Sequence, residues 1–209
     1  MRATFLNSVG ASAAFTPTWE SDNLGVATVT AEGLVTSVGF GTVSITARHP
    51  DGRQGSITIG VFPEMRAVWN ITIVRVSCIK VEMGSAGFAP CPPESGTTTS
   101  NTLTIGSLTP SSDDMMSVTG LYGGDSVEGT VDTAGQLSWS TLPVSESVGS
   151  NWDIGTGTNI RSREGVFQVA TSGEDLSGEY SYFSQYHGFS DASIDVTYTF
   201  IYRILSSYI

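Results

Sequence analysis

Positive charge is scarce in this chain. Its 209 residues include nine Lys and Arg, of which only Lys80 is a lysine, against twenty Asp and Glu, so the formal net charge is −11. About −10 of that charge falls on residues 64–209. A surface of this kind repels phosphate backbones, which argues against nucleic acid as a partner. The same acidic surface favours solubility and is also compatible with bound cations.

Long apolar runs are also missing. No stretch of 18 apolar residues exists, so we predict no transmembrane segment. Residues 1–15 lack the charged start, apolar centre and cleavage site of a signal peptide. If the protein is exported, we expect this chain to be a mature form, a piece of a longer one, or a protein that leaves by another route, for instance in a virion.

Catalytic and metal-binding motifs are absent as well. There is no G-x-S-x-G elbow, and the only histidines, His49 and His187, stand in no triad context, so we predict that the protein is not an enzyme. We expect no cofactor and no metal site. Glu174 and Asp175 at a hairpin tip leave Ca²⁺ open, although a bare polar turn is the simpler interpretation.

What the chain does contain is β-strand patterning. Apolar residues alternate with small polar ones in two early segments, 43–47 and 57–61, which is the period of half-buried strands. Gly33 and the Pro50-Asp51-Gly52 turn punctuate them. Helical periodicity is missing, and 39% hydrophobic content with 4 Trp, 7 Tyr and 9 Phe argues against disorder. We therefore predict an all-β fold that begins with a small antiparallel sandwich.

One segment matches a known pattern. Trp19 is followed by a Ser/Asp-rich turn, a V-A-T-V strand, a Gly-Leu-Val hairpin at residues 33–35 and the run G-T-V-S-I-T-A at residues 41–47. In this order the motifs resemble the bacterial immunoglobulin-like (Ig-like) group 2 module. The resemblance implies an Ig-like domain over residues 1–62 and a surface or secreted setting. Trp19 is best interpreted as a core anchor.

The start of that module departs from the family pattern, because only about 18 residues precede Trp19 where a further strand is usual. We expect residues 3–8 to supply a shortened first strand. If they do not, an unpaired sheet edge would remain, and such an edge can recruit a second copy by strand addition.

A second domain is predicted over residues 63–209, since Pro63 cannot donate to a strand ladder. Eight strands are expected at about 67–78, 101–107, 115–121, 125–132, 136–142, 164–171, 177–184 and 192–204. An eight-stranded antiparallel meander favours an up-and-down β-barrel, with a two-layer β-sandwich as the alternative. The layout resembles lipocalin-like and avidin-like meanders and carries no family residues over.

The barrel prediction places a candidate site. Connections in a meander alternate between the two ends, so the expected long loops 79–100, 143–163 and 185–191 meet at one end, away from the Ig-like module. Aromatic side chains there would make a mildly acidic mouth suited to a sugar ring or a small amphipathic molecule. The residues are Trp152, Asp153, Phe183, Tyr186, His187 and Phe189. Taken singly, Phe183 and Phe189 also fit core positions that anchor loops.

Cys78 and Cys91 are the only cysteines, and twelve residues separate them. We predict a disulfide that closes the first long loop, which agrees with an oxidising compartment. The alternatives are a reduced pair and a metal site. Further Cys or His ligands at a suitable spacing are lacking.

Together these patterns predict a non-catalytic binding or adhesion protein, extracellular or at the surface of a bacterium. An Ig-like stalk would present a barrel to a glycan, a surface polymer or a small ligand. The alternative is a structural subunit of a surface layer, filament or phage particle, with a virion surface as its location.

Overall fold

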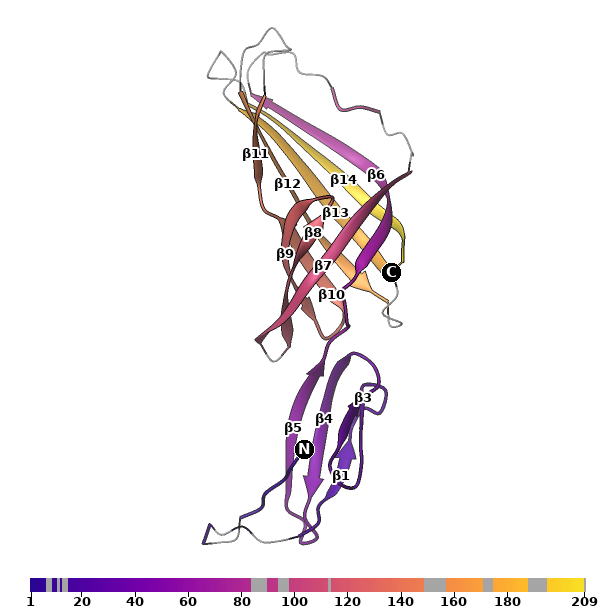
Figure 1. The fold of residues 1–209 in the computed structure, drawn as a ribbon, viewed down its shortest axis with the longest axis vertical. Helices are drawn as coiled ribbons and strands as arrows, with labels where there is room; N and C mark the ends of the chain where they lie inside the picture. The colour runs from indigo at the N-terminus through magenta and orange to yellow at the C-terminus, as the bar shows by residue number, and fades with distance from the viewer. Residues whose placement is uncertain are drawn as a thin grey trace.

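A computed structural model describes residues 1–6, 9–10, 12, 15–83, 90–93, 98–112, 114–148, 157–170, 175–187 and 195–208. These residues form strands and turns and no helix, as the all-β prediction requires. Two separate clusters of buried residues divide the strands into an N-terminal sandwich and a larger closed sheet (Figure 1).

The sandwich has two layers. One layer is a sheet in the order β1-β4-β5, made of β1 (Thr18–Ser21), β4 (Gly41–Arg48) and β5 (Gln54–Val61), and the other is the hairpin β2 (Ala27–Val29) and β3 (Val35–Ser37). Val26, Ala27, Val43 and Ile45 form its buried centre. Trp19 packs against that centre, half-buried, as predicted.

The prediction of a first strand over residues 3–8 is wrong for the residues that can be described. There the segment makes one isolated bridge, Leu6 with Ser12, and no ladder. Its apolar side chain at Phe5 instead packs against the rings of Phe15 and His49, with centroids 4.9 and 5.5 Å away. This aromatic cluster holds the segment against the sandwich through side-chain contacts, without a strand ladder along its backbone.

As a result β5 is a sheet edge, with β4 its sole partner within the described ranges. Ile57 on this strand is 52% exposed, although the alternating pattern predicted that it faces the core. The opposing hairpin has two strands of three residues each, so it covers only part of the longer sheet.

The second sheet closes on itself. Its strands are β6 (Val68–Met83), β7 (Thr98–Ser112), β8 (Met115–Tyr122), β9 (Asp125–Asp132), β10 (Gln136–Thr141), β11 (Val144–Val148), β12 (Gly157–Val169), β13 (Leu176–His187) and β14 (Asp195–Tyr208). Neighbours in sequence pair in antiparallel fashion except β10 and β11, which both pair with β12, and β14 pairs with β6. Eight strands therefore form a closed up-and-down barrel, and the sandwich alternative is wrong.

The ninth strand, β11, was not predicted. Leu142 and Pro143 end β10, and the chain then pairs with the early part of β12, so the expected loop 143–163 contains most of a hairpin. Pro143 explains the interruption, since proline has no N–H for a ladder. β11 continues the line of β10 beside the same strand, and β12 begins seven residues before the predicted position 164.

Apolar side chains fill the barrel from the end nearest the sandwich. The largest fully buried ones are Trp69, Tyr122, Phe167, Met65, Ile71, Leu103 and Leu137. At that end the β9–β10 turn touches the sandwich: Thr133 and Thr42 share a hydrogen bond of 3.1 Å, and Gly135 lies against the ring of Phe40. The strand ends at Met83, His187 and Asp195 meet at the opposite rim (Figure 1).

The predicted disulfide is confirmed. Cys78 and Cys91 are joined with an S–S distance of 2.04 Å and a Cα–Cα distance of 5.9 Å. Beside it, Arg75 donates hydrogen bonds to the carbonyl oxygens of Pro92 (3.3 Å) and Pro93 (2.5 Å). The segment 90–93 is therefore attached to the upper half of β6, beyond the point where β6 stops pairing with β7.

Candidate functional site

One row of residues runs around the barrel wall and faces its interior. Direct cross-strand pairs link Val118, Gly129, Trp139, Gly165, Tyr180 and Tyr202 in that order. Glycine on both sides of Trp139 leaves room for the indole. A Cβ atom on Gly165 would lie 2.6 Å from Cβ of Tyr180 and 3.0 Å from Nε1 of Trp139. Glycines at such positions let a sheet bend sharply.

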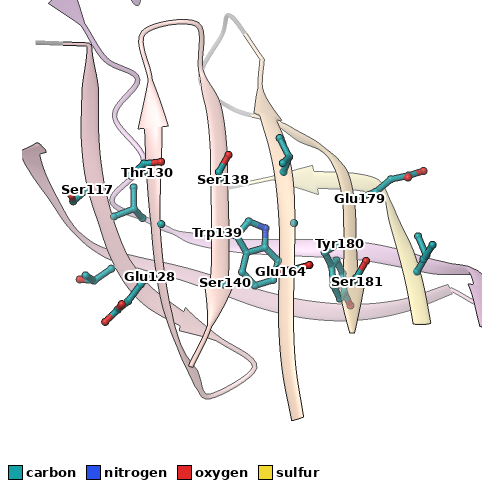
Figure 2. Close-up of a pocket in the computed structure, with 16 residues that line it drawn as sticks. Ser117, Glu128, Thr130, Ser138, Trp139, Ser140, Glu164, Glu179, Tyr180 and Ser181 are labelled. Atoms are coloured by element: carbon teal, nitrogen blue, oxygen red, sulfur yellow. The ribbon is translucent and has the colours of Figure 1, made fainter. Parts of the chain in front are cut away.

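A groove of about 960 Å³ crosses the outside of the wall over this row. It is lined by the outward-facing residues that flank the row on β8, β9, β10, β12, β13 and β14. Figure 2 shows the labelled side chains on successive strands, with Trp139 and Tyr180 between them. Both aromatic rings are buried, 4% exposed, so the side chains on the groove surface are serine, threonine and glutamate together with Val166 and Ile201, and more of the lining area is apolar than polar.

Three carboxylates line the groove, on Glu128, Glu164 and Glu179. Glu179 accepts a hydrogen bond of 2.8 Å from Nε of the exposed Arg203. Serine and threonine hydroxyls line the rest of it: Ser117, Thr119, Thr130, Ser138, Ser140 and Ser181. These donors and acceptors suit a neutral polar ligand.

A different group of side chains faces inward above the apolar core. Arg163 forms an ion pair with Asp125 and lies over two tyrosine rings, 5.3 Å from the centroid of Tyr122 and 4.9 Å from that of Tyr182. Tyr182 stacks on Phe200 at 5.8 Å. The guanidinium of Arg75 also lies close to Phe200, 5.8 Å from the ring centroid. Two cations and two rings are therefore neighbours in series, from Arg163 to Tyr182, Phe200 and Arg75.

Three tyrosine hydroxyls lie in the same layer. The Tyr122 hydroxyl donates to the Tyr180 hydroxyl at 2.8 Å, and the ring of Tyr202 stacks on that of Tyr180 at 5.1 Å. Burial raises the pKa of Tyr122, Tyr180 and Tyr202 above the usual value of 10. The positive charges of Arg75 and Arg163 partly offset this effect at Tyr202. We call these residues the arginine–tyrosine layer: Arg75, Tyr122, Arg163, Tyr180, Tyr182, Phe200 and Tyr202.

The predicted mouth is only partly visible. Trp152, Asp153 and Phe189 lie outside the described residues, and His187 ends β13 with its side chain outside them too. Phe183 and Tyr186 are both half-buried on β13, but strand alternation puts them on opposite faces, Tyr186 on the inner one with its pair Asn159. The structure does not bring these two together, and the mouth as a whole stays a prediction.

Over the described ranges, no group of three or more His, Cys, Asp or Glu side chains could hold a metal ion. In the same part of the chain, no helix has the length and apolar character that crossing a membrane requires.

Neither the groove nor the arginine–tyrosine layer was predicted from the sequence. The signal for the layer was present: Arg161 and Arg163 stand two apart, as do Tyr180 and Tyr182, which places each pair on one strand face. Because β12 was expected to begin at residue 164, both arginines were placed in a loop. The groove depends on pairing between strands, which one strand's pattern does not specify.

The fold thus defines an all-β protein in which a small sandwich precedes a closed barrel. A family model for the intimin immunoglobulin-like domain matches residues 6–51. This match supports a bacterial Ig-like segment and points to a surface protein of the adhesin type. The finer assignment to group 2, and the likeness of the barrel to lipocalins and avidins, stay predictions. No curated protein matches the chain.

Proposed function

We propose that this chain is a non-catalytic binding protein of a bacterial surface, in which the Ig-like sandwich carries the barrel and the barrel binds a neutral glycan in its outer groove. The observation that carries the proposal is the groove of about 960 Å³, whose walls offer hydroxyls and carboxylates from five strands. Sugars are recognised through hydrogen bonds to such groups. A groove that crosses several strands suits an extended chain of them.

The rigidity of the wall supports this choice. Each lining residue stands on a paired strand, so the backbone that carries these side chains is already ordered before a ligand binds. Position supports it too, since the sandwich touches the barrel at the β9–β10 turn and leaves the wall uncovered by the described residues.

A glycan array with the purified chain, followed by titration of any positive glycan, tests the proposal. Ser140→Tyr places a ring in the groove, and Glu164→Gln removes one acceptor charge without changing the side chain's shape. We expect both to weaken binding by about tenfold or more, as the loss of one hydrogen bond to a charged group would. Ser145→Tyr, on the exposed β11 outside the groove, is the matched control and keeps full affinity.

Unchanged affinity in both groove variants, with a glycan that the unaltered chain binds, would contradict the groove assignment. The same glycan tested against Trp152→Ala and Tyr186→Ala assigns binding to the predicted mouth if only these weaken it.

A structural role is the second candidate, favoured by β5, whose outer edge pairs with no strand among the residues that the structure describes. An edge strand of eight residues can add a strand from another molecule. Sedimentation equilibrium separates the two functions: a display protein stays monomeric, whereas a filament or capsid subunit associates. Lys or Pro substitution of the exposed Ile57 would abolish association through this edge.

A further inference from the structure

Basic residues are distributed unevenly over the barrel. Residues 64–209 contain sixteen Asp and Glu but six Lys and Arg. Arg66 and Arg203 are exposed and paired with Glu64 and Glu179. The other four, Arg75, Lys80, Arg161 and Arg163, take inward-facing positions on β6 and β12. A protein with a net charge of −11 thus gathers most of the barrel's positive charge on its inner face.

The register fixes these positions. Arg163 pairs directly with Tyr182, and Arg161 pairs with Ser184, which is 5% exposed and donates a hydrogen bond to the buried Asn159. Directly opposed residues in antiparallel strands share a face. Arg161 therefore extends the arginine–tyrosine layer toward the rim where β13 ends.

Two of these arginines pair with carboxylates. Asp125 pairs with Arg163, and Glu146 pairs with Arg161. The Nε atoms of Arg75 and Arg161 are both buried, and neither has a hydrogen-bond partner among the described residues. A buried donor without an acceptor costs free energy, and native structures rarely leave one in that state.

Solvent still reaches the layer. The side chain of Arg161 is 30% exposed and that of Arg163 is 19% exposed, while Tyr182, Phe200 and Tyr202 are half-buried. A ligand that enters from the rim would meet guanidinium groups first and aromatic rings beside them.

We propose that the inner face of the barrel binds a small organic anion, with its acidic group on Arg75 and Arg161 and its apolar body against Tyr182 and Phe200. The acidic group accepts hydrogen bonds from the two guanidinium groups, and a turn of either side chain toward it gives the buried Nε atom an acceptor. The rings provide the flat apolar surface, and the arginines supply positive charge in a barrel that is otherwise acidic. This site is separate from the outer groove.

The probe is anilinonaphthalenesulfonate, an aromatic anion that fluoresces when it leaves water, compared with N-phenylnaphthylamine, which has the same rings and no charge. We expect saturable binding of one sulfonate probe per chain, at least about tenfold tighter than the neutral probe. Inorganic sulfate should compete weakly, because it has no apolar body.

Substitutions then locate the site. Arg161→Gln and Arg75→Gln each weaken sulfonate binding by about tenfold and leave binding of the neutral probe unchanged. Arg161→Lys retains the charge and recovers part of the affinity. Arg203→Gln removes the same charge from the outer face and leaves binding unchanged. Circular dichroism of each variant verifies the fold. If Arg75→Gln does not fold, the binding measured with Arg161→Gln is the test of the proposal.

Three results would overturn the proposal. Equal affinity for the two probes would show that the layer does not recognise the negative charge of the sulfonate group. Full competition by sulfate would mean a simple inorganic anion site. Loss of binding in Arg203→Gln with none in Arg161→Gln would place the probe in the outer groove. Each of these is independent of whether the groove binds a glycan.

Discussion

Replacing Gly165 by alanine tests how tightly the barrel wall is bent around Trp139. The added Cβ would lie 2.6 Å from Cβ of Tyr180, 2.7 Å from the carbonyl oxygen of Glu179 and 3.0 Å from Nε1 of Trp139. Two of these neighbours belong to the paired strand β13, and the third is a buried ring. None is the free end of a flexible side chain, so the strand itself must shift.

Overpacking of this kind destabilises a protein by about 1–3 kcal/mol. A loss of about 2 kcal/mol corresponds to a Tm lower by roughly 4–8 °C in a chain of this size. Gly106→Ala is the matched control on β7, because its Cβ would meet only the carbonyl oxygen of Thr119 at an ordinary 3.8 Å. We expect that variant to stay within about 0.5 kcal/mol of the original chain.

Differential scanning calorimetry measures both variants, with the transition of the sandwich as an internal reference. If the Gly165→Ala and Gly106→Ala chains have the same Tm, the reasoning is refuted. That result would mean that Trp139 does not occupy the space above Gly165.

Two further predictions concern the covalent and proton-binding properties of the barrel. Replacing Cys78 and Cys91 together by serine removes a link across 13 residues and should lower the free energy of unfolding by about 3 kcal/mol, measured by urea titration; an unchanged midpoint would contradict it. The raised pKa values of Tyr122, Tyr180 and Tyr202 mean that the unfolded chain releases these protons first, so the contribution of these tyrosines to stability is complete below pH 10 and is lost as pH rises above it. Ultraviolet titration should show these hydroxyls ionising only with unfolding, and complete ionisation of all tyrosines near pH 10 in the folded protein would contradict it.

Local patterns were enough to predict much of this architecture. Alternation along β14, with Phe200, Tyr202 and Ile204 on one face and Arg203 on the other, identified the last strand and its inner side. Counting strands and turns predicted a barrel, and the spacing of Cys78 and Cys91 predicted the disulfide. Period and spacing are short-range properties, so a single segment reveals them.

Features that depend on pairing between distant segments were harder to predict. The expected first strand failed because Phe5 finds Phe15 and His49, a contact that no alternation reveals. β11 was missed because Pro143 ends β10, and only pairing with β12 shows that the chain continues as a strand beyond it. The groove requires the register of six strands, in which Gly129 and Gly165 flank Trp139. Such registers are set by the closed sheet as a whole.

Closure of the barrel through β10 and β12 underlies both proposed sites, and a cysteine pair tests it directly. Ser138 and Val166 are directly opposed in this pairing, and opposed residues have Cα atoms about 4.5–5.5 Å apart, within disulfide range. We predict that a chain carrying Ser138→Cys and Val166→Cys forms a second disulfide on mild oxidation, seen by peptide mapping. Ser138→Cys with Glu179→Cys, one strand further away, should not form one. A free thiol at both positions of the first pair, or a link in the second, would contradict the closed barrel.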